Sequence, residues 1–430
     1  MRLRTLSHLR NLKGKRVLVR VDFNVRVSAR GDIGKDDDDR IRASIPTVKH
    51  LSDRGAKVIL VSHLGRPKAR ERSLSLLPAA RLLEEQIRRP VRFITESLDD
   101  GDRVDRRLAA MQNGDIAMLE NIRFYKGEEK NSVFLARRLA SFADLYVDDA
   151  FSVAHRAHAS NVGITALLPS YAGECMRREV TQLSKVLEHP KHPFVVLIGG
   201  VKIETKLPLI ERLLPLADAV LIGGGMANNF FKAKGLRIGA SIYSRGDVKL
   251  AKALKGNRKI ILPTDVLVVK KITPDAPLRI ATPETIRPGE QIVDIGPETM
   301  RTFAAKVKTA QMIVWNGPMG IHEIPRFAHG SLILARVVAA RSTGKAFGVV
   351  GGGDTLPVLA KTGMGEFVDH VSTGGGAMLD FLGGKTLPGV EPLIERSAAK
   401  KRPAKTRSVP RKRPAAKKRP AKKRTTTKKR

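Results

Sequence analysis

Arginine and histidine side chains recur in three segments of the first half of the chain: SHLGRP at residues 62–67, LENIRF at 119–124 and DDAFSVAHRAH at 148–158. Arginine guanidinium groups bind compact phosphates and carboxylates through paired hydrogen bonds. A lone arginine after a strand is usually a surface charge, but five at or near expected strand ends favour a shared phosphate or carboxylate site. These five residues are Arg20, Arg40, Arg66, Arg123 and Arg156.

The second half carries glycine triplets followed by polar residues, GGGMAN at 223–228, GGGDT at 351–355 and TGGGA at 373–377. Glycine turns expose backbone N–H groups that cradle a polyphosphate. GGGDT alone is weak, because glycine beside an acid is often only a turn; in the functional interpretation Asp354 holds a magnesium ion. Together, the two halves indicate that a small phosphorylated acid and a nucleotide meet across a cleft.

Lys202 and Lys206 lie four residues apart. They would share one face, and could reach a transferring group, if a helix began at Ile203. Solvated lysines are an equally good interpretation of the pair on its own.

Three other kinds of site are not supported. Gly384-Lys385-Thr386 resembles the end of a Walker A loop, but Leu379 stands where the first glycine is required. No G-x-G-x-x-G opens a helix after the first expected strand, so a dinucleotide fold has no support. His155 and His158 have arginine neighbours and no matching cysteine or acidic cluster, which favours an anion site over a metal site.

The composition is that of a protein with real hydrophobic cores. A chain of 430 residues, 42% of them hydrophobic, is expected to form two domains. Cys175 is the only cysteine, which excludes a disulfide framework and indicates a reducing, cytoplasmic location. No apolar run approaches the ~18 residues that span a bilayer, and the N-terminal segment lacks the apolar centre of a secretory signal.

Positive charge is concentrated at the end of the chain. Residues 396–430 contain 18 Lys or Arg and no Asp or Glu, out of a formal net charge of +37, which leaves +19 for residues 1–395. This tail has almost nothing to bury, so we expect it to be disordered. It either binds nucleic acid or another polyanion without reading bases, or serves as a solvated segment; a charge run alone does not decide between the two. The rest of the chain is still basic, which suits anionic substrates.

Short apolar runs rich in β-branched residues alternate with helix-like segments such as 74–87. The runs are typical of strands buried on both faces, and the alternation predicts parallel α/β sheets. Polar or glycine residues follow each run closely, and ligands bind at the carboxyl ends of the strands in such sheets. The runs lie at residues 17–21, 58–61, 116–119, 145–147, 194–198, 219–222, 259–262, 312–315 and 346–350.

A connecting helix is predicted over 171–189, because apolar residues from Met176 to Leu187 recur at helical spacing and Pro190 then stops it. The expected fold is α/β, with two Rossmann-like doubly wound parallel-sheet domains joined by this helix and followed by the basic tail. The predicted divisions are an N-terminal domain at 1–170 that binds the phosphorylated acid, the connecting helix at 171–190, a C-terminal nucleotide-binding domain at 191–375, a return segment packing on the N-terminal domain at 376–395 and the tail at 396–430.

Taken together, these segments resemble the phosphoglycerate kinases over nearly all of residues 1–395. Eleven ordered motifs at family-like spacing are far more specific than any one alone. They are RVDFNV, DRIRASIPT, SHLGRP, LENIRF, AHRAHAS, GGVKIETK, GGGMA, DIGP, WNGPMG, GGGDT, and STGGGAML with GKTLPGV.

The resemblance implies a phosphotransferase of glycolysis and gluconeogenesis, acting as a cytoplasmic monomer. The implied reaction is reversible, magnesium-dependent transfer between ATP and the carboxylate of 3-phosphoglycerate, giving 1,3-bisphosphoglycerate and ADP. Because the two sites lie on different domains, the cleft must close to expel water, which argues for a hinge near the connecting helix and Thr373. The alternative is a polyanion- or DNA-binding protein on a kinase-like scaffold.

The resemblance also implies roles for individual residues. The substrate side comprises Asp22, Phe23, Asn24, Arg40, His63, Leu64, Gly65, Arg66, Arg123 and Arg156. The nucleotide side comprises Lys202, Lys206, Gly223, Gly224, Val293, Asn316, Ile321, Glu323, Gly352, Gly353, Asp354 and Thr355, with Asp354 also at Mg²⁺. The catalytic group comprises Arg40, Lys206, Thr373, Gly374 and Gly375. The family's last helix, expected at 387–394, returns to the N-terminal domain.

This chain departs from the family pattern at several positions. Asp148 stands where asparagine is usual and adds negative charge near the anion site, and Val201 adds bulk beside the triphosphate. None of the departures removes a matched phosphate-binding arginine or lysine, so they bear on affinity more than on reaction type. The other departures are Arg26 for proline, Ser152 for glycine, Asn228 and Asn229 after GGGMA, and His322 for an aromatic residue.

Overall fold

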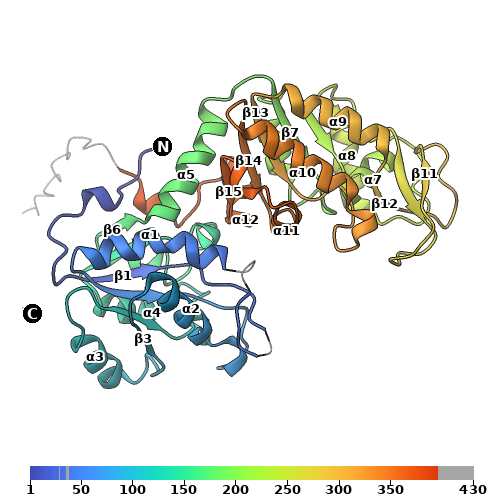
Figure 1. Ribbon diagram of the computed structural model, residues 1–430. Helices are drawn as coiled ribbons and strands as arrows, with labels where there is room; N and C mark the ends of the chain where they lie inside the picture. Colours follow the sequence, from blue (N-terminus) through green and yellow to red (C-terminus); the bar gives the residue numbers. More distant parts are fainter. Residues whose placement is uncertain (29, 35–37, 396–430) are drawn as a thin grey trace, which may run out of the picture. The chain divides into compact units, whose positions relative to one another are not determined.

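The structure is a computed structural model that describes residues 1–28, 30–34 and 38–395. Two six-stranded parallel sheets with covering helices make up most of this part of the chain (Figure 1), so the predicted α/β fold class is confirmed. The tail at 396–430, with its expected disorder, lies outside the described residues. No helix among those described has the length and apolar character needed to cross a membrane.

The first sheet is built from β1 (Arg16–Arg20), β2 (Lys57–Val61), β3 (Val91–Ile94), β4 (Ile116–Leu119), β5 (Leu145–Asp148) and β6 (Ser170–Ala172). Their spatial order is β3-β4-β2-β1-β5-β6, all parallel. The register sets Arg20 beside Val61 on one side and beside Asp148 on the other. The segments that follow β1, β2, β4 and β5 therefore start from one edge of the sheet. The helices of this half are α1 (Asp39–Asp53), α2 (Leu77–Ile87), α3 (Gly101–Ala109) and α4 (Val133–Ser141), with short 3₁₀ turns that include η3 (Ile122–Phe124) and η4 (Phe151–Val153).

The second sheet is built from β7 (Phe194–Ile198), β8 (Ala219–Ile222), β9 (Ile260–Ile261), β13 (Met312–Asn316), β14 (Phe347–Gly351) and β15 (His370–Ser372). Their order is β15-β14-β13-β7-β8-β9. A separate antiparallel sheet, which the apolar runs did not predict, contains β10 (Val266–Val269), β11 (Arg279–Ala281) and β12 (Gln291–Ile295). The helices of this half are α6 (Leu207–Leu213), α7 (Gly224–Ala233), α8 (Arg245–Leu254), α9 (Pro297–Thr309), α10 (His329–Ser342), α11 (Leu356–Lys361) and α12 (Gly376–Leu382).

The central strands are buried on both faces, as their unbroken apolar runs predict. Every residue of β7 is buried, and alternate residues point to opposite faces of a strand. Phe194 and Val196 accordingly belong to one hydrophobic cluster, whereas Val195 and Leu197 belong to another. The helices on each face therefore lock the strands in register, which fixes the loops at their carboxyl ends.

The connecting helix is α5 (Glu174–Glu188). It begins at residue 174, since the residues just before it form β6 beside β5. Its Met176 and Val180 side chains are buried. Its Glu179 accepts hydrogen bonds from His370 Nε2 at 2.7 Å and Ser372 Oγ at 2.8 Å. One buried carboxylate thus joins the helix to the last strand of the second sheet.

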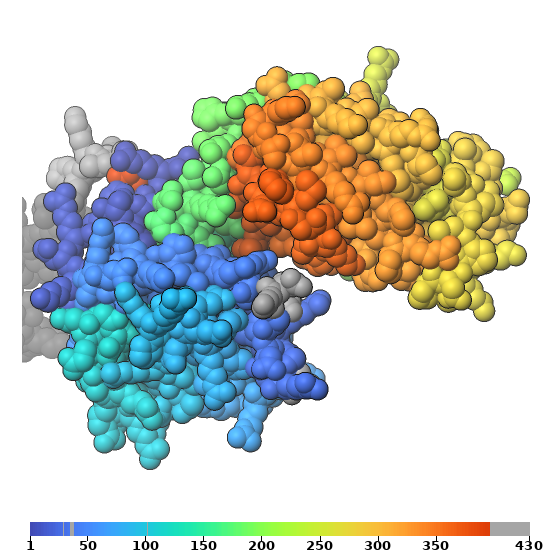
Figure 2. Space-filling model, in the orientation of Figure 1, coloured from blue at the N-terminus to red at the C-terminus, as the bar shows by residue number. Residues whose placement is uncertain are grey.

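The expected helix over 387–394 is absent, and that expectation is wrong. The segment holds a single 3₁₀ turn, η8 (Glu391–Leu393), because Pro388 and Pro392 interrupt any longer helix. It does lie against the start of the chain: the Arg4 N–H donates to Leu393 O at 2.8 Å, and Leu3 forms a bridge with Ile394. Figure 2 shows the last described residues, in red, beside the blue N-terminal residues.

Candidate active site

A cationic pocket of about 340 Å³ lies at the carboxyl edge of the first sheet. It gathers residues from the loops after β1, β2, β4 and β5, and it also includes the glycine loop that precedes α12. The expected site residues that line it are Asn24, Arg40, His63, Gly65, Arg66, Arg123, Arg156, Gly374 and Gly375. We name this cavity the cationic pocket.

A fully buried arginine supports the pocket from below. Arg20 donates from Nε to Ser160 Oγ at 2.8 Å, and its Nη2 lies 3.0 Å from His63 Nδ1. Burial, followed by the charges of Arg20 and Arg123, lowers the pKa of His63 well below its usual value. The neutral imidazole accepts from Arg20 at Nδ1, so the proton sits on Nε2. Because His63 lines the pocket, this proton is available to an anion.

Arg40 lies in the first turn of α1, and an acidic neighbour orients it. Its Nη1 contacts Asp22 Oδ2 at 2.7 Å and Asn24 O at 3.3 Å. The Ser152 hydroxyl bonds the same Asp22 oxygen. Asp22 is itself nearly buried, so its role in this structure is to hold the Arg40 guanidinium at the pocket rather than to line the cavity.

Arg123 is held by backbone. Its Nη1 donates to Gly65 O at 2.6 Å. Asn121 then ties the loops after β2 and β4 together: its Oδ1 accepts from the backbone of Leu64 at 3.2 Å and of Arg123 at 3.1 Å, while its Nδ2 donates to Leu64 O at 2.8 Å. Sequence reasoning missed Asn121, although its place inside LENIRF was a signal.

Phe23 and Leu64 are placed differently from the expectation that they contact substrate. The Phe23 side chain is fully buried in the core, and its N–H donates to Ser62 Oγ at 2.8 Å. The Leu64 side chain is also buried, with both backbone polar groups bonded to Asn121. Apolar side chains in these loops anchor them to the core, and neither residue lines the cationic pocket.

Four further residues line the cationic pocket: Ser152, Val153, Gly376 and His155, whose sequence setting favoured an anion site. His155 Nε2 accepts from Arg156 Nε at 3.1 Å, and burial and the Arg156 charge lower the pKa of His155. The AHRAH repeat of histidine and arginine carried this signal. His155 therefore orients Arg156 instead of binding a metal.

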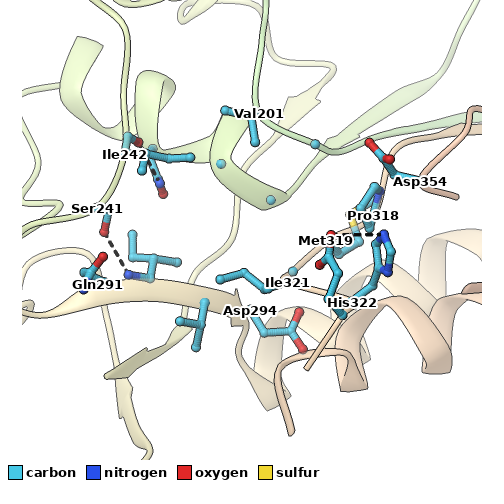
Figure 3. Close-up of a pocket in the computed structure, with 18 of the residues that line it drawn as sticks. Val201, Ser241, Ile242, Gln291, Asp294, Pro318, Met319, Ile321, His322 and Asp354 are labelled. Carbon is cyan, nitrogen blue, oxygen red and sulfur yellow. Dashed lines mark hydrogen bonds and ion pairs between the residues drawn. The ribbon is translucent and has the colours of Figure 1, made fainter. Parts of the chain in front are cut away.

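A second cavity, of about 490 Å³, lies at the carboxyl edge of the second sheet; we name it the nucleotide pocket. Val201 and Ile321 lie on opposite sides of it, with Asp354 at one end and Ser241 and Gln291 at the other (Figure 3). Its walls are largely apolar, as a flat aromatic base requires. The expected site residues that line it are Lys202, Lys206, Gly224, Val293, Ile321, Glu323 and Asp354.

Five expected nucleotide residues lie outside the lining: Gly223, Asn316, Gly352, Gly353 and Thr355. Asn316 Nδ2 donates to Gly351 O at 2.9 Å, and the buried Thr355 hydroxyl accepts the Gly317 N–H at 2.7 Å. These side chains fasten the ends of β13 and β14 to each other. In this structure they shape the loops beneath the pocket.

Lys206 is a half-buried cation of the nucleotide pocket. Burial lowers its pKa from 10.5 to about 8, while the charge of Asp354 acts in the opposite direction. The ammonium group donates to Gly199 O. The two lysines would share one helix face only if a helix began at Ile203. No helix begins there, because α6 begins at Leu207, with Pro208 in its first turn. Lys202 is exposed, but it also lines the nucleotide pocket.

A glycine allows Lys206 to reach this position. Gly317 has φ +94°, and a Cβ there would lie 2.4 Å from both Gly199 O and Lys206 Nζ. Any other residue would strain the backbone and displace the ammonium group. The WNGPMG segment thus fixes the lysine through backbone shape.

Thr373 stands apart from the lining of the cationic pocket. Its N–H donates to Glu179 Oε1 at 2.9 Å, and it borders a separate cavity of about 760 Å³ beside α1, α5 and α11. The neighbouring Gly374 and Gly375 do line the cationic pocket. The connecting helix therefore holds the base of the glycine loop. The Gly374 N–H donates to Ser372 Oγ at 3.2 Å within that loop.

Within the described chain, His, Cys, Asp and Glu side chains form no group of three or more that could hold a metal ion. Asp354 offers one carboxylate at the end of the nucleotide pocket. Magnesium commonly takes only one or two protein carboxylates and completes its shell with phosphates and water. A single aspartate beside a polyphosphate site fits that pattern.

Comparison with known proteins points to one family. Residues 6–385 match the model of the phosphoglycerate kinase family. Phosphoglycerate kinase of Dictyoglomus turgidum is 45% identical over 400 residues, covering 91% of this chain and 99% of the relative. That of Moorella thermoacetica is 45% identical over 398 residues, covering 91% and 99%. Among solved structures, phosphoglycerate kinase from Coxiella burnetii has a TM-score of 0.79 and 39% identity, covering 91% of this chain and 98% of that chain.

Proposed function

Because the chain belongs to the phosphoglycerate kinase family, we propose that it transfers a phosphoryl group reversibly between ATP and the carboxylate of 3-phosphoglycerate, giving 1,3-bisphosphoglycerate and ADP in glycolysis and gluconeogenesis. The observation that carries the proposal is the pair of pockets. One gathers arginines, and the other combines apolar walls with a half-buried lysine and a carboxylate. Residues 1–170 would bind the phosphorylated acid, and residues 191–375 the nucleotide.

The cationic pocket suits the phosphate of 3-phosphoglycerate. Arg66, Arg123 and Arg156 supply guanidinium groups that pair with phosphate oxygens. The Nε2 proton of His63 adds a neutral donor. Since Arg40 is held at the rim by Asp22, we assign it to the carboxylate end of the acid and to the group in transfer.

The chemical step needs alignment and charge neutralisation more than acid–base catalysis. The attacking carboxylate is already ionised, so no general base is required. Negative charge spreads over three equatorial oxygens in the transition state. Lys206, Arg40 and the N–H group of Gly375 are the groups of this chain that would stabilise it, while Gly374, whose N–H is bonded to Ser372 Oγ, would shape the loop.

The family also implies magnesium bound with the nucleotide, and Asp354 is the residue that would hold it. When bound, the ion supplies charge neutralisation of the phosphate oxygens. Lys206 would work beside it, and an anionic ligand would raise the pKa of Lys206 from about 8 and keep its ammonium group charged.

A coupled assay tests the proposal. Purified protein with ATP, magnesium and 3-phosphoglycerate is expected to form ADP only when the acid is present. Equal ADP formation without the acid, or none with it, would contradict the proposal. Gel filtration of the same sample tests the accompanying expectation of a monomer, and cell fractionation tests the cytoplasmic location.

A second activity is proposed for the tail at 396–430, which lies outside the described residues. Its 18 Lys or Arg and absence of Asp and Glu favour non-specific binding of nucleic acid or another polyanion. This would accompany the kinase reaction rather than replace it. The competing interpretation, a solvated segment with no ligand, is separated from it by the truncation described in the Discussion.

A further inference from the structure

A buried carboxyl group with one unpartnered oxygen lies at the end of β5, beside Arg20 of β1. Asp148, the last residue of β5, has no exposed surface. Its Oδ1 accepts the Ala150 N–H at 3.0 Å, whereas its Oδ2 has no hydrogen-bond partner. Asparagine is usual at this position of the family pattern, so the ionisable group is a departure of this chain. A buried carboxylate without full pairing is costly, which favours its protonated form.

Asp148 reaches the pocket through one intervening side chain. The register of β1 and β5 pairs it with Arg20. Arg20 in turn contacts His63 Nδ1 at 3.0 Å, and His63 lines the pocket. A charge that appears on Asp148 therefore acts directly on the cation that supports the anion-binding histidine.

Arg20, the cation beside Asp148, is already linked to another carboxylate, Glu128, through Ser160. The Tyr146 hydroxyl of the same strand donates to Ser160 O at 2.9 Å. The Ser160 hydroxyl, which accepts from Arg20, donates to Glu128 Oε1 at 2.6 Å. Although burial acts to raise the pKa of Glu128, hydrogen bonding from His158 and the charge of Arg20 lower it. Glu128 is thus the ionised partner of Arg20.

The next residue, Asp149, is also buried, but its environment differs. Its Oδ1 accepts the N–H groups of Cys175 at 2.8 Å and Met176 at 3.3 Å, at the start of α5. Burial raises the pKa of Asp149 to about 8. Burial likewise raises the pKa of Asp148 to about 7, against the opposing effects of the Ala150 N–H, the Arg20 charge and the Tyr146 hydroxyl.

We propose that Asp148 is a positioning residue which, acting through Arg20 and His63, makes the affinity of the cationic pocket for a phosphorylated acid depend on pH. When protonated it is neutral, and the positive potential of the pocket is complete. As the pH rises through neutrality it becomes a carboxylate behind Arg20, and the potential falls. Binding therefore weakens with rising pH. The inference rests on the proposed function, because it takes 3-phosphoglycerate as the ligand.

Calorimetric titration of 3-phosphoglycerate into wild type and Asp148→Asn tests the inference. At about pH 6 the two dissociation constants are expected to agree closely. At about pH 8 the wild type is expected to bind about tenfold more weakly, because one unit charge ~10 Å away at an effective dielectric of ~20 changes affinity about 16-fold once the carboxyl group is fully ionised. The ligand's own phosphate titrates near pH ~6, but it does so equally with both proteins.

The same pair of strands offers a matched control. Asp144 immediately precedes β5 and contacts Arg16 Nη2 at 3.1 Å, at the opposite end of β1 from Arg20. It is partly exposed. Asp144→Asn removes the same charge from the same domain, and its dissociation constant is expected to keep a fixed ratio to that of the wild type at both pH values.

A wild-type to Asp148→Asn ratio that is the same at both pH values overturns the inference. Absence of 3-phosphoglycerate binding by all three proteins contradicts the proposed function instead. Infrared difference spectra between the two pH values give a second measurement: a protonated-carboxyl band of the wild type should be missing from Asp148→Asn, while Asp149 contributes to both. A spectrum unchanged by the substitution also overturns the inference. Asp148→Ser gives the same comparison if Asp148→Asn does not fold.

Discussion

The two pockets are held in shape by different means. In the cationic pocket, side chains position other side chains: Asp22 holds Arg40, and Ser160 and His63 hold Arg20. In the nucleotide pocket, the glycine turn at Gly317 and the carbonyl of Gly199 hold Lys206. A change of charge should therefore damage the first pocket most, and a change of backbone shape should damage the second.

The ligands explain the difference. A small phosphorylated acid offers little area, so it must be bound by charge, and closely spaced arginines repel one another unless acids lie between them. Asp22, Glu128 and Glu129 serve that purpose. A nucleotide offers a flat apolar base and a flexible polyphosphate, which apolar walls and backbone N–H groups can bind.

The largest effect is expected from Arg40→Ala. It removes a transition-state charge contact, so turnover should fall about 10²–10³-fold, with only a modest loss of nucleotide binding. Steady-state kinetics and nucleotide calorimetry measure the two effects. Near-normal turnover in this variant would remove Arg40 from the mechanism.

Arg42→Ala is the matched control for Arg40→Ala. Arg42 lies in the same turn of α1 but pairs with Asp38 and Asp39, and it does not line the cationic pocket. Its turnover should stay close to that of the wild type. An equal loss in both variants would show that the helix, and not the guanidinium group of Arg40, is responsible.

The fold was predictable where long apolar runs are buried on both faces. β4, β7 and β8 begin and end at the predicted residues. β3 was missed because it is a short edge strand whose Arg92 is exposed. β15 was missed because its His370 and Ser372 are polar and are satisfied by Glu179 from a distant helix. No local pattern contains that partner.

The site was predictable to the extent that its chemistry lies in single residues after strands. The arginines at 40, 66, 123 and 156 line one cavity. Asn121, Asn316 and Thr355 also bond neighbouring loops to each other, a role that sequence reasoning did not supply. The nucleotide-binding roles of Asn316 and Thr355 stay predictions. Predicting the loop-bonding role requires knowing where backbone N–H and C=O groups of neighbouring strands meet.

Asp354→Ala should affect the nucleotide side alone. Productive use of MgATP, measured as kcat/KM, is expected to fall about 10- to 100-fold, since the carboxylate that would hold the magnesium ion beside the phosphates is lost. 3-Phosphoglycerate binding, measured by calorimetry, should stay unchanged. Glu211→Ala, an exposed acid on α6, is the control for loss of one negative charge. Equal loss of both ligands would indicate misfolding or a misplaced site.

Gly317→Ala tests the dependence on backbone shape. The new Cβ would lie 2.4 Å from Gly199 O and Lys206 Nζ, so we expect the free energy of unfolding to fall by about 2–4 kcal/mol. We also expect lower affinity for the nucleotide. Gly344→Ala has the same kind of backbone, with φ +77° and nothing within 4 Å. It should lose only about 1 kcal/mol. Equal losses in chemical denaturation would show that backbone strain, and not the collision at Lys206, decides the outcome.

The smallest effect on catalysis is expected from removing residues 396–430. Arg40 and Arg123 at the cationic pocket have acidic partners close by, whereas the tail carries 18 positive charges and no acid in its own sequence. With no acid in the tail's own sequence to neutralise them, we expect these charges to bind an external polyanion. The tail contributes no residue to the proposed active site, so the kinetics of a 1–395 truncation should match those of the full chain. DNA binding should be lost with the tail, and in the full chain it should weaken steeply with salt, with a log–log slope near −0.9 per phosphate neutralised.

DNA-binding measurements on both proteins at low and physiological salt test this prediction. Equal DNA binding by both would place the polyanion site on residues 1–395, and no binding by either would leave the tail as a solvated segment. A truncation that also lost kinase activity would show that the end of the described chain, where Leu393 bonds to Arg4, needs the tail to stay in place.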